Sequence, residues 1–252
     1  FDGVVKSWPD QVTMLDNAKE SDPVDNAMFW GFVNNNLPMV KKLEERKHKF
    51  WFTDTPYFGR FDNNNLKPDN HYWRICRNGI HAEYIKMCKS DRFDKFKIKI
   101  KAPDFKGSYV LVCPSSPSIH QYLGKPNWTA DTVEQIKRYT DRPIKIREKP
   151  RGRGTSGPSE AKVPLSEDLK DAWVVVTSCS IAAVEAQCMG VPVICDEKSF
   201  AKEVGGQELA DIENPYFVGC EDWLFSLAYQ QFTPEEIANG KAVEILMDKG
   251  LL

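Results

Sequence analysis

The feature that most constrains the fold is a continuous apolar run, residues 173–177 (WVVVT), followed by a Ser-Cys-Ser turn and another apolar segment. An unbroken run rich in β-branched residues is typical of a strand buried on both faces of a parallel sheet. Residues 180–189 then predict a helix that Gly190 ends, and residues 191–195 (VPVIC) predict the next strand. We therefore expect an α/β protein with a parallel sheet.

The same alternation of strand and helix extends on both sides of this segment. Residues 109–113 (YVLVC) and 144–148 predict strands, and residues 129–140 predict a helix with Asp131 and Glu134 in capping-box spacing. Gly, Pro and Ser are frequent in residues 149–160, which indicates a mobile loop. Four segments near the N-terminus predict a β-α-β unit and a further strand: residues 27–32, 37–47, 49–53 and 71–76. The C-terminal residues 233–247 begin with a Thr-Pro-Glu-Glu capping box and predict one long surface helix.

Length and charge indicate two parts. The 252 residues, of which 41% are hydrophobic, suffice for two small domains. Pro and Gly interrupt a Lys-rich stretch at residues 102–107, which places the domains at 1–105 and 106–252, with the last helix able to pack back on the first domain. The net charge of −2 divides into +4 for residues 1–101 and −6 for the rest, so the basic surplus belongs to the N-terminal part.

Seven cysteines occur without Cys-x-x-Cys spacing or nearby histidines, so we expect a reducing, cytoplasmic location and no metal site. The N-terminus (FDGVVKSWPD) lacks a basic region before an apolar stretch, and the chain contains no run of about 18 apolar residues. We expect neither secretion nor a membrane span. The first residue is Phe rather than Met, which leaves room for residues before it.

Hydroxyl groups follow two of the predicted strands, at the carboxyl ends where ligands bind in open α/β sheets. Ser115, Ser116 and Ser118 follow the first strand, and Ser178 and Ser180 follow residues 173–177. With the N–H groups at the start of a helix, they could bind a phosphate. An ordinary Pro/Ser turn and an ordinary helix cap are the alternatives.

Basic residues follow the strand at 144–148. Arg147 and Lys149 lie on one face at a spacing of two, and Arg151 and Arg153 come next in the loop. Four cations suit a diphosphate. The alternative is a solvated charged strand and loop.

Glu185 lies midway along the predicted helix among small residues, where its carboxylate could bind ribose hydroxyls. The whole pattern of residues 180–194, S-x-x-A-x-E-A-x-x-x-G-V-P-V-I, resembles the sugar-nucleotide-binding segment of GT-B glycosyltransferases. The resemblance covers roughly residues 108–205, and nucleotide-sugar epimerases share the pattern. It implies two Rossmann-like lobes facing a cleft, a donor diphosphate at the turn, the ribose on Glu185, and Arg147 and Lys149 in place of a metal ion.

Candidate bases come from the N-terminal part. Asp54 ends the strand at 49–53, and His81 follows in Arg-Asn-Gly-Ile-His; either could take a proton from an acceptor hydroxyl. A capping Asp and a structural His are the ordinary alternatives. Nearby aromatic residues could stack on a base or a sugar, although core packing also explains them: Tyr57, Phe58, Tyr72 and Trp73.

The segments WFTDTPYFGR and YWRICRNGIH resemble small glycosyltransferase-like proteins of tailed phages, some of which glucosylate hydroxymethylated bases in DNA. This implies a reduced N-terminal lobe that faces DNA. Lysines of residues 95–101 alternate with apolar residues, so a strand would present one basic face to phosphates, unless it is a solubilising edge strand. The expected acceptor side comprises Tyr57, Arg60, Arg74, Lys95, Lys97, Lys99, Arg151 and Arg153.

Together these features predict a metal-independent glycosyltransferase that needs no cofactor besides its UDP-sugar co-substrate. It would transfer glucose from UDP-glucose to a hydroxymethylated pyrimidine, such as 5-hydroxymethylcytosine, in double-stranded DNA in the cytoplasm of a phage-infected host. A transferase acting on a surface glycan, a nucleotide-sugar epimerase and an inert DNA-binding module are the alternatives.

Overall fold

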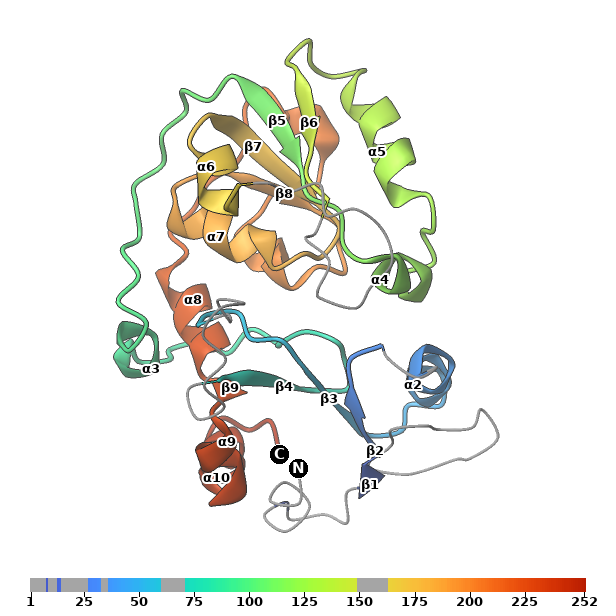
Figure 1. Cartoon of the computed structure of the whole chain (residues 1–252), viewed down its shortest axis with the longest axis vertical. Helices are drawn as coiled ribbons and strands as arrows, with labels where there is room; N and C mark the ends of the chain where they lie inside the picture. Colours follow the sequence, from blue (N-terminus) through green and yellow to red (C-terminus); the bar gives the residue numbers. More distant parts are fainter. Residues whose placement is uncertain (1–7, 9–12, 15–26, 33–35, 60–70, 149–162) are drawn as a thin grey trace. The chain divides into compact units, whose positions relative to one another are not determined.

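The computed structural model describes residues 8, 13–14, 27–32, 36–59, 71–148 and 163–252. The chain divides into two compact units (Figure 1). Unit 1 comprises residues 1–97 and 222–252, and unit 2 comprises residues 98–221. The sequence predicts one boundary at 105/106, whereas the first boundary in the structure lies at 97/98 and the last 31 residues belong to unit 1. No helix in the described ranges is long and apolar enough to cross a membrane.

Unit 1 contains a five-stranded mixed sheet in the order β1-β2-β3-β4-β9. Its strands are β1 (Thr13–Met14), β2 (Ala27–Trp30), β3 (Phe50–Asp54), β4 (Trp73–Arg77) and β9 (Gln231–Phe232). The first three are parallel, and α2 (Asn36–Glu45) links β2 to β3, which confirms the predicted β-α-β unit. Because β4 pairs antiparallel with β3, and β9 pairs antiparallel with β4, unit 1 differs from the expected Rossmann-like lobe, whose strands would be mostly parallel.

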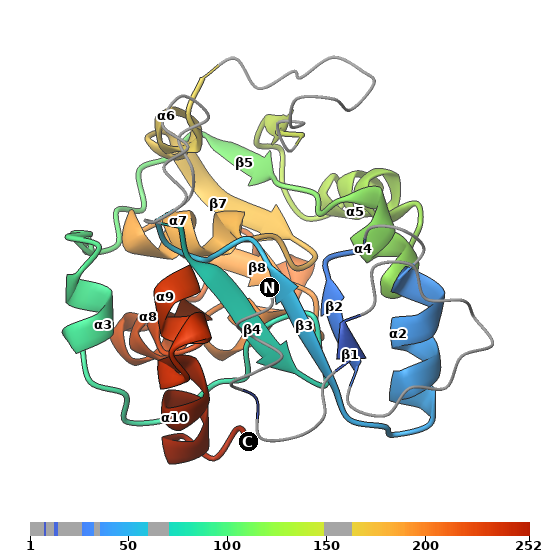
Figure 2. The same cartoon turned by 60° about the horizontal axis from the view of Figure 1, so that its bottom comes forward.

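The C-terminal helices cover one face of this sheet (Figure 2). Met28, Trp51 and Ile75 point to that face and pack against Ile237 and Leu246 in one buried cluster. The helices on this face are α9 (Pro234–Ala238) and α10 (Lys241–Asp248), whereas α8 (Glu221–Ala228), which precedes β9, contributes no residue to this cluster. Burial of this apolar surface attaches the end of the chain to its beginning.

The prediction of a single helix over residues 233–247 is wrong, because the structure has two helices there, α9 and α10. Gly240 stands at the break with φ of 82°, a left-handed conformation that favours glycine. The capping box at its start is confirmed: the side chain of Thr233 accepts from the N–H of Glu236, whose side chain accepts from the N–H of Thr233.

Unit 2 contains a four-stranded parallel sheet in the order β6-β5-β7-β8, which confirms the parallel sheet predicted after residue 108. Its strands are β5 (Tyr109–Val112), β6 (Ile144–Ile146), β7 (Ala172–Thr177) and β8 (Val193–Cys195). Helix α5 (Trp128–Ile136) lies on one side of the sheet, and α6 (Leu165–Leu169) and α7 (Ala182–Cys188) lie on the other (Figure 1). Three further helices lie in the connections: α4 (Pro117–Tyr122), η2 (Phe200–Glu203) and η3 (Leu209–Asp211).

Alternate strand residues give unit 2 its core. Val112, Val176 and Ile194 face α5 and pack with its Trp128 and Ile136. The capping box expected at Asp131 and Glu134 is wrong, because α5 begins at Trp128 and both residues lie inside the helix.

The strand expected for residues 95–101 is also absent from the described structure. Helix α3 (Asp91–Asp94) ends just before it, and Lys97 has φ of 53°. The alternation of exposure nevertheless remains, since the lysines are exposed and Phe96, Ile98 and Ile100 are half-buried. The segment then pairs with the end of α7 through Lys101 N–H, which donates to the carbonyl of Cys188 at 2.9 Å. Pairing with a helix end rather than with a strand explains why the alternation did not produce a strand.

Candidate functional site

The middle of the unit 2 sheet is a topological switch point. The chain leaves β5 for β6 on one side and then crosses to β7 on the other, so the loops after β5 and β7 turn toward opposite faces. Ligands of open α/β sheets bind at such points, outside the carboxyl ends of the strands. Ser115 and Ser116 follow β5 here, and Ser178 and Ser180 follow β7. The structure thus brings together the two groups of serines that the sequence indicates.

Hydrogen bonds between side chains connect these two loops. The hydroxyl of Ser178 donates to the hydroxyl of Ser115 at 2.7 Å, and the latter also accepts from the N–H of Cys179 at 3.2 Å. Thr177 donates through its hydroxyl to the carbonyl of Cys113 at 2.7 Å. Ser178 is fully buried, so its expected role as a direct hydroxyl donor to a phosphate is wrong: the hydroxyl is used between strands. Ser180 is half-buried at the start of the following turn.

His120 completes this network. The sequence does not indicate it as a site residue. Its Nε2 lies 3.1 Å from the hydroxyl oxygen of Ser178, and its ring stacks on Trp128 with centroids 5.3 Å apart. Burial lowers the pKa of His120, against an opposing effect of Asp196. The imidazole is therefore neutral near pH 7. A lone histidine in PSSPSIHQ carries no sequence signal that distinguishes it from a structural one.

Arg147 lies after β6, where the sequence places it, but it is not a free cation. Its guanidinium forms an ion pair with Asp168 and donates to the carbonyl of Val163 at 2.8 Å. Lys145 contacts the other oxygen of Asp168 at 2.6 Å. Burial raises the pKa of Asp168, but hydrogen bonds from Lys145 and Arg147 outweigh it and leave that pKa below its ordinary value. Asp168 therefore stays ionised and holds both cations.

Asp168 is a second site residue that the sequence does not indicate, because in LSEDL it looks like an ordinary acidic residue of a surface helix. Three other expected cations, Lys149, Arg151 and Arg153, lie outside the described residues.

Glu185 lies half-buried on α7 near the end of β5. Burial raises the pKa of the Cys113 thiol to about 12; Arg147 opposes this effect, and Asp168 and Glu185 add to it. Charges of both signs thus gather around Cys113 at the carboxyl end of the central strand. The described residues include no group of three or more His, Cys, Asp or Glu side chains that could hold a metal ion.

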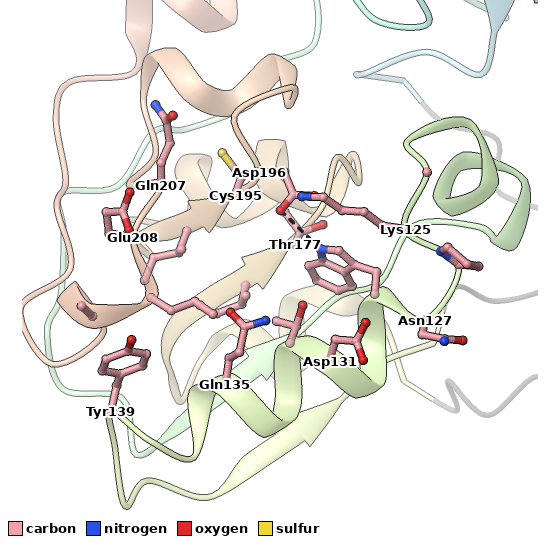
Figure 3. A pocket seen from close by; sticks show the side chains of 18 residues that line it. Lys125, Asn127, Asp131, Gln135, Tyr139, Thr177, Cys195, Asp196, Gln207 and Glu208 are labelled. Carbon is pink, nitrogen blue, oxygen red and sulfur yellow. Dashed lines mark hydrogen bonds and ion pairs between the residues drawn. The ribbon is translucent and has the colours of Figure 1, made fainter. Parts of the chain in front are cut away.

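A cavity of about 450 Å³ adjoins the serine network on the α5 side of the sheet (Figure 3). Asp131 and Gln135 reach it from α5, and Gln207 and Glu208 reach it from the segment before η3. The indole N–H of Trp128 donates to Asp196 at the cavity wall at 3.3 Å. Because the Trp128 ring also stacks on His120, the cavity and the serine network share a wall.

In unit 1 the structure pairs Asp54 with Arg74. The guanidinium of Arg74 donates to Oδ2 of Asp54 at 2.9 Å, and the N–H of Thr55 donates to Oδ1 at 2.6 Å. Arg74 is 2% exposed, so the expected contact between Arg74 and DNA is wrong: the cation lies inside the unit and binds a carboxylate.

Tyr57 and His81 also meet in unit 1. The hydroxyl of Tyr57 accepts from the N–H of Ala82 at 2.8 Å and lies 3.3 Å from Nδ1 of His81. Tyr57 is buried, and burial raises the pKa of its phenol well above its ordinary value. Its expected role as a stacking platform for a base is wrong, because the ring is part of the core. Arg60 lies outside the described residues, and Lys95, Lys97 and Lys99 are exposed.

No family model and no curated protein matches this chain. Among solved structures it is similar to a β-Kdo 2,4 transferase, KpsC of Thermosulfurimonas dismutans, at 12% identity with a TM-score of 0.43, over 84% of this chain and 85% of that one. It is also similar to the β-Kdo 2,7 transferase of the same KpsC at 10% identity with a TM-score of 0.41, over 87% and 85%.

Proposed function

We propose that this chain is a glycosyltransferase whose unit 2 binds a nucleoside-diphosphate sugar. The observation that carries the proposal is the hydrogen bond between Ser115 and Ser178, which fixes the two loops at the switch point. The segment that resembles the sugar-nucleotide-binding segment of GT-B enzymes begins there and continues into α7 with Glu185. In an α/β sheet this is the position that ligands occupy.

We assign the donor's parts to residues according to their burial. Ser116 and Ser180 are half-buried and can present hydroxyl groups to the diphosphate, whereas Ser115 and Ser178 hold the loops in place. Glu185 would accept hydrogen bonds from the ribose.

Arg147 and Lys145 bring two positive charges against the single negative charge of Asp168. This leaves a surplus of positive charge near the departing diphosphate, which would stabilise the charge that develops on it. Lys149 follows two residues later in the sequence and is proposed to assist. No metal ion is needed in this arrangement.

The donor site is tested by isothermal titration of the purified protein with UDP and UDP-glucose. Glu185→Gln replaces the charged, two-oxygen acceptor for the ribose by an amide with one neutral acceptor and should weaken UDP binding by about 10- to 100-fold, the range for a hydrogen bond to a charged group. Glu203→Gln, the same change at an exposed residue of unit 2, is the matched control and should bind as the parent does. Absence of binding by any nucleoside diphosphate would refute the proposal.

For the acceptor we propose a hydroxymethylated pyrimidine in DNA and, for the sugar, glucose. The support is the surplus of +4 in residues 1–101 and the exposed Lys95, Lys97 and Lys99, which could contact phosphates. A base in a duplex would have to flip out to reach the donor. Asp54 and His81 are the candidate bases; because both oxygens of Asp54 already accept hydrogen bonds, we favour His81.

The burial of Tyr57 and Arg74 favours a second candidate, a transferase acting on a surface glycan, since it removes two of the expected DNA contacts. Mass spectrometry distinguishes the two candidates. Incubation with UDP-glucose should add a hexose to hydroxymethylcytosine or hydroxymethyluracil DNA under the first, and to an oligosaccharide but not to DNA under the second. An epimerase would instead convert UDP-N-acetylglucosamine with no acceptor present.

A further inference from the structure

The cavity of unit 2 is chemically unlike a phosphate site. Three carboxylates line it, from Asp131, Asp196 and Glu208. Lys125 is the one cation among its described lining residues, and its ammonium already lies 3.2 Å from Asp196. The cavity therefore carries a net negative charge that repels a diphosphate.

The remaining lining groups are neutral and both donate and accept hydrogen bonds. Asn127, Gln135 and Gln207 contribute amides, and Tyr139 contributes a phenol whose residue is 47% exposed. A carboxylate can accept hydrogen bonds from two neighbouring hydroxyls at once. A side-chain amide can donate to a hydroxyl oxygen or accept from a hydroxyl hydrogen. This set matches a ring that carries several adjacent hydroxyl groups.

The cavity also has an apolar wall and a suitable size. Val176, Ile194 and Leu209 line it beside the polar groups, so the C–H groups of a ring would find an apolar surface. A volume of about 450 Å³ lies within the range of small-molecule sites, in which a few polar groups fix the orientation of a ligand against apolar walls.

From this geometry we propose that the cavity between α5 and the segment 207–210 binds a neutral, polyhydroxylated ring, that is, a saccharide or ribose moiety, and excludes phosphate. The site stands independently of the proposed transferase activity. If that activity is correct, the shared wall of Trp128 places this ring next to the donor turn. The ring could then belong to the donor or to a separate glycan.

The first test is a titration of ¹⁵N-labelled protein with glucose, followed by chemical-shift changes of backbone amides. We expect changes at residues 124–135, 195–196 and 207–210, with a Kd on the order of 1 mM for so small a ligand. Asp131→Ala and Gln135→Ala should weaken binding at least about tenfold, whereas Asp141→Ala, an exposed aspartate of the same unit, should not. The proposal is overturned if glucose shifts no cavity amide, or if inorganic pyrophosphate binds there equally well.

Competition then identifies the source of the ring. Displacement of glucose by UDP alone indicates the donor's ribose, and would place the ribose in the cavity instead of at Glu185. Displacement only by UDP-glucose indicates the donor's sugar, and binding of glucose alongside UDP-glucose indicates a separate glycan. Each result requires a saccharide in the cavity and supports the proposal. Shifts at Ser180 and Glu185 report the donor site in the same spectra. If glucose shifts the cavity amides but UDP shifts neither Ser180 nor Glu185, the transferase proposal is refuted and the cavity site stands. If UDP shifts Ser180 and Glu185 but glucose shifts no cavity amide, the cavity site is refuted and the transferase proposal stands.

Discussion

The hydroxyl of Ser178 donates a 2.7 Å hydrogen bond to the hydroxyl of Ser115, 63 residues earlier in the chain. The bond joins the carboxyl ends of β7 and β5, the two central strands of the unit 2 sheet. His120 lies against the same hydroxyl of Ser178. The switch point is thus held by side chains that the protein keeps out of solvent, and the half-buried residues around them remain for a ligand.

We expect Ser178→Ala to lower the free energy of unfolding by about 1–3 kcal/mol, because Ser115 and His120 lose a shared partner in a buried place. Urea unfolding followed by circular dichroism measures the change. Ser118→Ala, at a half-buried serine of α4, should stay within about 0.5 kcal/mol of the parent. Equal effects of the two substitutions would show that the Ser115–Ser178 bond contributes nothing to stability.

His120 should make stability depend on pH in mildly acidic solution. Burial lowers its pKa in the folded protein, against the effect of Asp196, while the unfolded value is about 6.5. As pH falls below about 6.5 the unfolded chain binds a proton that the folded protein does not, so the free energy of unfolding falls until the folded pKa is reached. His120→Gln should lack this loss in urea unfolding measured from about pH 8 to pH 5. Parallel pH curves for parent and variant would contradict the prediction.

Alanine substitutions at Gly190 and Gly124 distinguish the cost of an unfavourable backbone conformation from the cost of a steric clash. Both have a positive φ, 76° and 72°, but a Cβ at Gly190 would lie 2.2 Å from the carbonyl oxygen of Ala102, whereas Gly124 has nothing within 4 Å. Gly124→Ala should cost about 1 kcal/mol for the conformation alone. Gly190→Ala should cost several times more, or prevent folding of unit 2, as thermal unfolding would report. Similar costs at the two positions would mean that residues 101–104 can move away from α7.

The buried Arg92 and the half-buried Glu236 form an ion pair that connects α3 to α9. The guanidinium bonds both oxygens of Glu236, at 2.8 and 3.0 Å, and the carbonyls of Ala228 and Gln231. We expect Glu236→Gln to cost about 2–4 kcal/mol of unfolding free energy, since it leaves a buried cation without its carboxylate. Glu235→Gln, at the exposed neighbour, should be nearly neutral in the same urea titration.

The same pair predicts a loss of stability in acid. Burial raises the pKa of Glu236, but hydrogen bonds from Arg92 and from the N–H of Thr233 outweigh it, and the net pKa is lower than usual. Its contribution is therefore complete above the unfolded pKa of about 4.3 and disappears as pH falls through the lower folded value. Glu236→Gln should remove this part of the decrease in unfolding free energy at low pH, as measured by urea unfolding. If parent and variant lose the same stability in acid, the ion pair is not the cause.

The parallel sheet of unit 2 could be predicted because its signals are local. The run at 173–177, the alternation at 144–148 and the positive φ of Gly190 each follow from the conformational preferences of neighbouring residues. Position after a strand was also enough to find Ser115 and Ser178, since the carboxyl end of a strand is fixed once the strand is known.

What those side chains do was not predictable, because it depends on partners far away in the sequence. No local sequence pattern indicates that Arg147 forms an ion pair with Asp168, or that Arg74 forms one with Asp54. Lysines and isoleucines alternate in residues 95–101 as in a strand, yet the chain there pairs with the end of α7 and not with a sheet edge.

The sequence by itself therefore determined the four strands of the unit 2 sheet, their parallel arrangement and the serines that follow them, because short-range preferences and periodicity specify them. Only the tertiary structure decided which charges are free and which are paired, where the last helices pack, and that an acidic cavity adjoins the serines. These features arise from burial and from contacts between residues that no local pattern connects.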